Sequence, residues 1–341
     1  MTAVLLEHPS SLDHLTGGHP EQPARIVAID RELERLGWLG FERLRSPPVA
    51  RALLTAVHPE SYVAAIERFC EAGGGNLDLD TVASSGSFSA ALHGAGGAVR
   101  LVDMLLDGEA TTGFSIHRPP GHHATVSRPM GFCLFNSVAV AATHALSRLS
   151  RVMIVDWDVH HGNGTNDIFH QSDQVLFVSI HQSPLYPGTG PASDVGSGTG
   201  EGFTVNLPVA PGSGDEEFCS LVDHVVVPLV VAFEPQLLLI SAGYDAHLED
   251  PLAACEVTEP GFAQMTRSLR GAAAQVGAPL GAVLEGGYAL GALARSVAAT
   301  LEALRQPESV ESPEAASDRG LTRSALAARE RLARWWPGLG G

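Results

Sequence analysis

The stretch RVMIVDWDVHH, residues 151–161, is the most informative part of the chain, because an apolar run ends abruptly in carboxylates and imidazoles. Three further runs have the same form, at residues 174–181, 237–243 and 279–287. Short runs that are apolar at nearly every position are typical of strands buried on both faces, as in a parallel sheet. The sequence therefore predicts that these four runs form buried parallel strands.

Helical patterns separate these runs. Apolar side chains at Ile26, Ile29, Leu33 and Leu36 recur at the spacing of one helix face. We expect the first quarter of the chain to be mainly helical, with a loop at residues 73–76. Alternation of strands with helices defines an α/β fold. The expected helices cover residues 23–36, 58–72, 87–107, 137–147, 216–233, 259–275 and 290–305.

The length of 341 residues, with 45% hydrophobic residues, suits one large α/β domain. We expect a single domain over residues 1–341 with a core of about residues 15–305. The polar residues 306–319 are expected to form an exposed loop. A helical pattern resumes over residues 321–336, where Trp335 and Trp336 are expected to pack back on the domain because exposed indole rings are unfavourable.

Composition excludes several classes of function. The 21 basic residues, all arginine, and the 38 acidic residues give a net charge of −17 with histidine neutral. Binding to a nucleic-acid backbone needs clustered basic residues, so we expect no such partner. The four cysteines form no CxxC pair, and no apolar run is long enough to span a bilayer. We expect a soluble cytoplasmic protein, and the lysine-free composition favours a GC-rich bacterial source.

Polar residues that can carry chemistry follow the apolar runs. Asp158 and His160 lie two residues apart at a strand end, so their side chains are expected to point to the same side. Asp245 follows another run, and the carboxyl ends of parallel strands meet where open sheets bind ligands. Two carboxylates and one imidazole with an open position describe a catalytic zinc site, although the same donors suit Fe(II).

Two further features point to catalysis. His122 and His123 follow a rigid Pro-Pro-Gly turn, and paired histidines serve as metal ligands or as proton-transfer groups. Tyr288 follows two glycines, which allow the backbone to approach a site closely. The tyrosine hydroxyl could then donate a hydrogen bond to a developing oxyanion.

Ordered motifs extend through nearly the whole chain, namely HPEQPAR at 19–25, RPPGHHA at 118–124, GFCLFN at 131–136, DWDVHHGNGT at 156–165, YPGTG at 186–190, SAGYDAHLEDP at 241–251 and EGGY at 285–288. Together they resemble the zinc-dependent histone deacetylase family, which is related to arginase. The PPGHHA and HHGNG forms are similar to its class II branch and to bacterial amidohydrolases of that branch.

The resemblance implies a single-domain arginase and deacetylase fold, with a central eight-stranded parallel sheet flanked by helices. It implies one Zn²⁺ per subunit, held by Asp158, His160 and Asp245. When bound, such an ion polarises an acyl carbonyl and lowers the pKa of a coordinated water. The reaction implied is hydrolysis of an acetylated amine to acetate and free amine.

The same resemblance assigns roles around the metal. His123 is implied as the general base, and His122, oriented by Asp156, as its electrostatic partner. Asn163 stands where class I members have an aspartate, so it orients the His123 ring without adding charge, as is usual in class II. Tyr288 is implied to stabilise the oxyanion together with the metal.

A substrate tunnel is also implied. Gly131, Phe132 and Tyr186 match its lining, with the two aromatic rings on either side of a methylene chain. Arg25 matches an arginine near the internal exit for acetate.

Monovalent cations, usually K⁺, bind near the active-site loop in this family. The first implied site uses Asp156, the Ser179 hydroxyl and main-chain oxygens of Asp158, His160 and Ile180. The second uses main-chain oxygens of Phe169, Ser172, Val175 and Phe203.

Two positions bear on the substrate. Leu252 is apolar where polyamine-selective members carry an acidic residue, which disfavours a cationic acetylpolyamine. Asp80 is the candidate acceptor for a peptide backbone at the tunnel rim. We expect deacetylation of acetyl-lysine, or of short acyl-lysine, in proteins or peptides. The alternative is hydrolysis of an acetylpolyamine or another small acetylated amine.

A third possible function is that of a binding module that retains the deacetylase pocket without activity. The complete set of expected catalytic residues argues against it. Hydroxamate-type inhibitors are expected to bind, and assembly into a homo-oligomer is left open.

Overall fold

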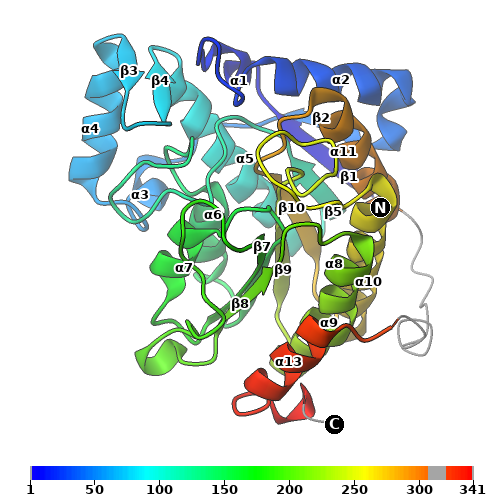
Figure 1. Cartoon of the computed structure of the whole chain (residues 1–341). Helices are drawn as coiled ribbons and strands as arrows, with labels where there is room; N and C mark the ends of the chain where they lie inside the picture. Colours follow the sequence, from blue (N-terminus) through cyan, green and yellow to red (C-terminus); the bar gives the residue numbers. More distant parts are fainter. Residues whose placement is uncertain (1, 306–319, 340–341) are drawn as a thin grey trace.

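Eight parallel strands form the central sheet of the computed structural model, which describes residues 2–305 and 320–339. Their order is β2-β1-β5-β10-β9-β6-β7-β8, and helices lie on both faces (Figure 1). The α/β fold expected from the sequence is thereby confirmed. The strands are β1 (Thr2–Glu7), β2 (Glu42–Arg45), β5 (Ala110–Ser115), β6 (Val152–Asp156), β7 (Val175–Gln182), β8 (Thr204–Val209), β9 (Leu237–Ala242) and β10 (Leu280–Leu284).

Strand β6 shows why the apolar runs become buried strands. Its five residues are all buried, and successive side chains enter different cores on the two faces of the sheet. Met153 and Val155 belong to one core, whereas Val152 and Ile154 belong to the other. Because both faces are covered by helices, the strand tolerates no polar position until its carboxyl end.

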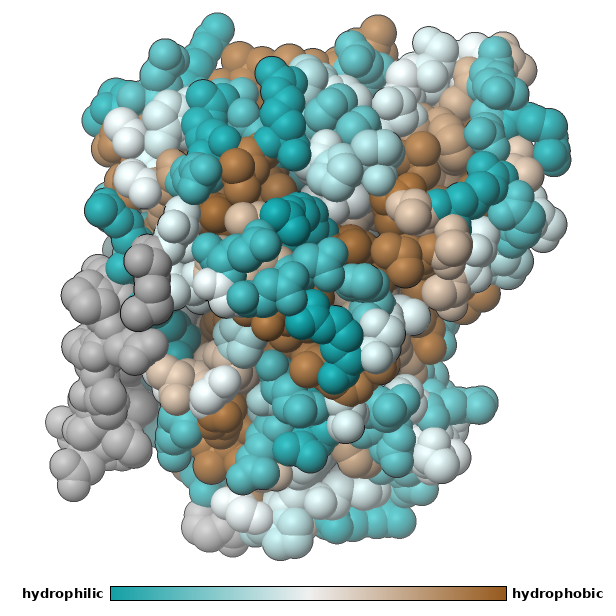
Figure 2. Space-filling view, turned by 180° about the vertical axis from the view of Figure 1, so that it is seen from behind, coloured by the Kyte–Doolittle hydropathy of each residue, from teal (hydrophilic) through white to brown (hydrophobic). Residues whose placement is uncertain are grey.

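The helices divide into two layers. One layer, with α2, α8, α9, α10, α11 and α13, packs on the face that contains Met153, and α4, α5 and α6 pack on the other. Hydrophilic residues cover much of the rear of the molecule (Figure 2). The helices are α1 (Ser10–Asp13), α2 (Ala24–Arg35), α3 (Arg51–Leu54), α4 (Glu60–Glu71), α5 (Ser87–Leu106), α6 (Ser137–Ala145), α7 (Asn163–Phe169), α8 (Asp215–Leu221), α9 (Val227–Phe233), α10 (Glu259–Val276), α11 (Leu290–Arg305) and α13 (Arg323–Leu332).

The amino-terminal quarter differs from the mainly helical expectation, because β1 and β2 belong to the main sheet. Strand β2 has the sequence ERLR and no buried residue, so it lacks an apolar run. The expected loop at residues 73–76 is wrong in part, since β3 (Gly74–Asn76) pairs with β4 (Val82–Ser84) in a separate antiparallel pair. That pair is set by main-chain hydrogen bonds, which a glycine run does not reveal.

The expected helix over residues 216–233 is interrupted. Helices α8 and α9 are separated by a π-helical turn, Val222–Val226. Pro228 lies just after this turn and has no main-chain N–H to donate to the preceding turn. Although π-helices are rare, they occur mostly as single turns of this kind inside α-helices.

The carboxyl-terminal region packs on the body of the domain through Trp336. Its indole ring lies 5.4 Å from the Phe203 ring and 6.1 Å from the Phe233 ring, between centroids. Its Nε1–H donates to the Gly202 carbonyl at 2.9 Å. The expected loop at 306–319 lies outside the described residues. Within the described part of the chain, no helix combines the length and apolarity needed to cross a bilayer.

Five neighbouring strands, β5, β10, β9, β6 and β7, bring their carboxyl ends to one edge of the sheet. The polar segments that follow them therefore meet in space although they are far apart in sequence. In open parallel sheets this edge is where ligands bind.

Candidate metal and catalytic site

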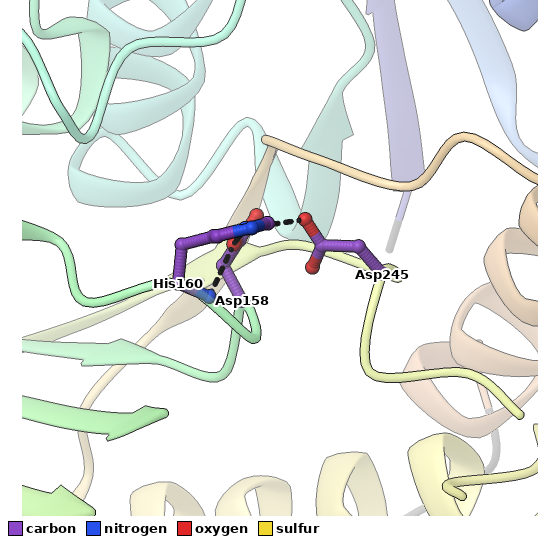
Figure 3. Close-up of side chains that lie close together, drawn as sticks. All are labelled: Asp158, His160 and Asp245. Atoms are coloured by element: carbon purple, nitrogen blue, oxygen red, sulfur yellow. Dashed lines mark hydrogen bonds and ion pairs between the residues drawn. The ribbon is translucent and has the colours of Figure 1, made fainter. Parts of the chain in front are cut away.

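Three side chains converge at this edge of the sheet. Asp158 and His160 come from the loop after β6, and Asp245 comes from the loop after β9 (Figure 3). All three are buried, and one candidate ligand atom from each lies within 4.8 Å of the others. His160 Nδ1 lies 3.2 Å from Asp158 Oδ1 and 3.0 Å from Asp245 Oδ2. Sequence reasoning named these residues, and the structure brings them together.

The backbone around the three side chains leaves room for their carboxylates. A Cβ atom on Gly243 would lie 2.1 Å from Asp158 Oδ2, and one on Gly286 would lie 2.3 Å from Asp245 Oδ2. Main-chain amides orient the same groups, since Gly286 N–H donates to Asp158 Oδ2 at 2.8 Å. Burial and the nearby Asp158 charge raise the pKa of Asp245. Two buried carboxylates in such proximity, with one imidazole, fit a divalent cation.

The histidine pair lies beside these ligands. The rings of His122 and His123 are 4.0 Å apart between centroids. His122 Nδ1 lies 2.9 Å from Asp156 Oδ2, and His123 Nδ1 lies 2.7 Å from Asn163 Oδ1. Each ring is thus oriented through Nδ1, which leaves Nε2 for other contacts.

The pKa values of the two histidines are shifted in opposite directions. Burial and the neighbouring His122 lower the pKa of His123 well below its usual range. Burial acts in the same direction on His122, but the charges of Asp158 and Asp156 outweigh it and raise the pKa of His122 well above its usual range. Paired groups with opposite shifts are typical of acid and base assignments in active sites.

Tyr288 lies within reach of the same site. Burial raises the pKa of its phenol well above the usual range, so the hydroxyl stays protonated and can donate. Its ring makes an edge contact with Phe132 at 5.6 Å, and the Arg25 guanidinium lies 5.0 Å from the ring centroid. Arg25 itself is fully buried and donates to the Gly287 carbonyl at 2.7 Å.

The expected tunnel residues border the histidine pair. Gly131 has φ of +55°, and a Cβ atom there would lie 2.3 Å from His123 Cδ2, so this position has no room for a side chain. The next residue, Phe132, also has a positive φ, of 69°. The Tyr186 ring lies 5.2 Å from the His123 ring and is 37% exposed, so it extends from the site toward solvent.

The two expected rim residues lie on separate loops. The loop of Asp80 is joined to Phe132, an expected lining residue, because Phe132 N–H donates to Thr81 Oγ1 at 3.2 Å. The Asp80 carbonyl lies 3.1 Å from His19 Nε2. Leu252 is partly buried, and its N–H donates to Asp250 Oδ1 at 3.0 Å.

At both expected potassium sites some of the oxygens already have hydrogen-bond partners. At the first site, Ser179 Oγ lies 2.9 Å from His181 Nδ1, and Asp156 Oδ1 accepts from Asp158 N–H at 3.0 Å. Asp156 and Ser179 are register partners in β6 and β7, and Ile180 follows Ser179 in β7. At the second site, the main-chain oxygen of Phe169 accepts from Ser172 N–H, and that of Phe203 accepts from Phe177 N–H, both at 2.9 Å. Val175 begins β7 beside them.

Sequence reasoning missed the buried groups that support these side chains. Glu21 is fully buried and contacts both Arg25 and Arg118. Glu285 accepts from Gly121 N–H at 2.6 Å and therefore joins the EGGY segment to the histidine turn. Asp250 accepts from Tyr288 N–H. All three lie within the quoted motifs, but residue type alone does not show that a carboxylate meets buried guanidinium groups, as Glu21 does, or main-chain amides, as Glu285 and Asp250 do.

The fold and the buried site together describe an α/β protein with a candidate metal site at the carboxyl edge of a parallel sheet. A model of the histone deacetylase domain matches residues 19–304, so the chain belongs to the histone deacetylase family. This confirms the family identified from the motifs, and supports a deacetylase or amidohydrolase activity.

Known relatives agree with this assignment. The chain is 39% identical to a probable deacetylase of Archaeoglobus fulgidus, with 90% of each chain covered. It is 39% identical to a histone deacetylase-like amidohydrolase of Pseudomonas aeruginosa, with 80% of this chain and 73% of the relative covered. The crystal structure of the HDA15 HD domain superposes with a TM-score of 0.90 at 35% identity, covering 99% of this chain and 96% of that one.

Proposed function

We propose that this chain is a zinc-dependent deacetylase that removes acetyl, or another short acyl group, from lysine side chains. The observation that carries the proposal is the convergence of Asp158, His160 and Asp245 beside the histidine pair. These three residues would hold Zn²⁺ and leave a position open for water and substrate. When bound, the ion would supply Lewis-acid activation of the acyl carbonyl and of water.

The histidine pair would move the protons. His123 Nε2, on a ring held through Nδ1 by Asn163, would take a proton from the attacking water. The same nitrogen would then return the proton to the leaving amine. His122, held through Nδ1 by Asp156, would stay beside the reacting atoms as an electrostatic partner.

Tyr288 would donate its hydroxyl proton in a hydrogen bond to the carbonyl oxygen as that oxygen gains negative charge. The raised pKa of the phenol supports this role because it keeps the donor protonated. The Arg25 guanidinium would contact the face of the ring. That Arg25 lies near an internal exit for acetate stays a prediction.

The tunnel and its rim would select the substrate. Phe132 and Tyr186 would contact the methylene chain of an acyl-lysine, and Gly131 would keep the lining close to His123. Asp80 would accept a hydrogen bond from the peptide backbone. Leu252 offers no carboxylate to the extra ammonium groups of a polyamine.

Potassium at the two expected sites, a single domain over the whole chain and a cytoplasmic location stay predictions. Potassium binding is tested by comparing the thermal midpoint in KCl with that in tetramethylammonium chloride at equal ionic strength.

A paired hydrolysis assay tests the proposed function. The wild-type protein is given an acetyl-lysine peptide and, separately, acetylputrescine, before and after treatment with a chelator. We expect the peptide to have the higher kcat/KM, and we expect chelation to abolish activity that added Zn²⁺ restores. Restoration by Fe(II) alone would replace the metal in the proposal, and preference for acetylputrescine would replace the substrate.

Matched histidine variants separate chemistry from general damage. His123→Ala should abolish hydrolysis, whereas His144→Ala should not, because His144 pairs at 2.7 Å with Asp103, a residue of α5 outside the site. Full activity of His123→Ala would overturn the assigned base.

A further inference from the structure

We propose that Asp250 is a positioning residue. It holds the main chain at Tyr288 so that the tyrosine hydroxyl can reach the substrate carbonyl, an inference that rests on the proposed function. Asp250 lies outside the candidate metal ligands and the histidine pair. Its side chain is buried, with only 7% of the residue exposed, so a carboxylate has been placed there at a considerable cost in desolvation. Its hydrogen-bond partners show what that carboxylate contributes.

Asp250 receives three main-chain amides from two loops. Its Oδ2 accepts from Tyr288 N–H at 2.6 Å and from Ala289 N–H at 3.1 Å. Its Oδ1 accepts from Leu252 N–H at 3.0 Å. The carboxylate thus joins the loop after β9 to the loop after β10, at the residue expected to donate to the oxyanion.

The main chain just before Tyr288 needs such an external restraint because Gly286 and Gly287 have no side chains that could hold it. A Cβ atom on Gly286 would lie 2.3 Å from Asp245 Oδ2 and 2.6 Å from Asp158 Oδ2. Gly287 has φ of +117°, a conformation that residues with a Cβ atom rarely adopt. Glycine has more backbone freedom than other residues. Hydrogen bonds at Gly286 N–H and at the Gly287 carbonyl limit that freedom up to Gly287, and the Asp250 carboxylate continues the restraint at Tyr288 N–H.

Contacts of the Tyr288 side chain are less directional than this backbone clamp. The ring makes an edge contact with Phe132, and the Arg25 guanidinium lies over it, but contacts with a ring do not fix where the hydroxyl lies. Across residues 2–305 and 320–339, the hydrogen bond from Tyr288 N–H to Asp250 is the one that anchors this residue directly.

Loss of the clamp should therefore impair catalysis through Tyr288. A displacement of about 1 Å in a catalytic group can cost about a hundredfold in rate. Because the metal ligands and the tunnel lining are held by other contacts, we expect kcat to fall while KM and metal content change little.

A double-mutant cycle tests this assignment. The variants are Asp250→Ala, Tyr288→Phe and the double variant, with kcat, KM, zinc content and thermal midpoint measured for each. Asp250→Ala should lower kcat by about tenfold to a hundredfold in the wild-type background. In the Tyr288→Phe background the same change should lower kcat by less than about threefold, because the hydroxyl that Asp250 positions is already gone.

Two further variants complete the design. Asp250→Asn can keep one oxygen facing the amides of Tyr288 and Ala289, so its kcat should lie between those of wild type and Asp250→Ala. If Asp250→Ala does not fold, Asp250→Asn takes its place in the double-mutant cycle. Glu249→Gln is the matched control, since the neighbouring Glu249 carboxylate is bound by Arg295 at 2.7 Å on the exposed side and should leave kcat unchanged.

Equal loss of kcat in the two backgrounds would overturn the proposal, because Asp250 would then act independently of the Tyr288 hydroxyl. Loss of zinc in Asp250→Ala would also overturn it and assign Asp250 to the metal site. Failure of the proposed function looks different, since wild type and Tyr288→Phe would then show the same rate. Unchanged kcat in Asp250→Ala, with Tyr288→Phe impaired, refutes the clamp alone.

Discussion

Replacing Glu21 with glutamine should destabilise the protein far more than replacing an exposed glutamate. Glu21 is fully buried, and its carboxylate contacts the buried guanidinium groups of Arg25 and Arg118. Glutamine has nearly the same shape, so the change removes the charge without opening a cavity. It leaves two buried guanidinium groups without the carboxylate that they share.

The size of the effect follows from this geometry. Breaking a buried ion pair by removing one partner typically costs about 3–5 kcal/mol. The entropy of unfolding of a 341-residue chain is roughly 0.7 kcal/mol/K near the midpoint, at about 2.1 cal/mol/K per residue. Glu21→Gln should therefore lower Tm by roughly 4–7 °C, as measured by calorimetry at neutral pH.

Glu60→Gln is the matched control. Glu60 contacts Arg51 at 2.6 Å, but their side chains are 62% and 42% exposed, so its loss should change Tm little. Equal changes in Tm for the two variants would refute the reasoning.

The difference between wild type and Glu21→Gln should also depend on pH. The charge of Arg118, despite burial, holds the pKa of Glu21 well below its usual range. A carboxyl group with a depressed folded-state pKa stabilises the fold fully above its unfolded value, and this stabilisation is lost as the pH falls. The advantage of wild type should therefore shrink below about pH 4.5. An advantage that grows on acidification would contradict the assignment.

The remaining predictions concern the site. Asp245→Ala should abolish both zinc retention and turnover, and stoichiometric zinc with a normal rate would show that the ligand set is wrong. Tyr288→Phe should lower kcat by roughly a hundredfold to a thousandfold while the protein stays folded and still binds a hydroxamate, whereas a rate within a few-fold of wild type would make this tyrosine structural. Leu252→Glu should shift the ratio of kcat/KM for acetylpolyamines to kcat/KM for acetyl-lysine peptides upward by roughly tenfold. An unchanged ratio would show that residue 252 does not select between these substrates.

The central strands could be predicted from sequence because burial on both faces leaves a strong pattern. Strand β6 has five buried residues in succession, and a short run of this kind bounded by polar residues is typical of a strand inside a parallel sheet. Strand β2 could not be predicted, since as an exposed edge strand it joins the sheet through main-chain hydrogen bonds to β1 and not through apolar side chains. The π-helical turn at Val222–Val226 was missed because apolar periodicity continues through it.

In the candidate site, too, some residues could be predicted from the sequence and others could not. Asp158, His160 and Asp245 could be predicted because their residue types are unusual directly after buried strands. Asp250 and Glu285 received no role, although both lie in recognised motifs. Their function in the structure is to accept from main-chain amides, and any segment supplies those amides. Three-dimensional coordinates are needed to show which amides meet which carboxylate.

The charge balance of the site supports the proposed metal independently of any family likeness. Five carboxylates at the carboxyl ends of β6, β9 and β10, or in the segments that follow them, are each at most 7% exposed: Asp156, Asp158, Asp245, Asp250 and Glu285. Asp250 and Glu285 are met by main-chain amides, and Asp156 by His122. Asp158 and Asp245 both contact the imidazole of His160, and Asp158 also lies 3.7 Å from His122 Nε2. Two imidazoles thus face the three aspartates, which leaves negative charge in excess. Buried charge of one sign is stable only when it is paired, so this excess favours a cation at the point where Asp158, His160 and Asp245 converge.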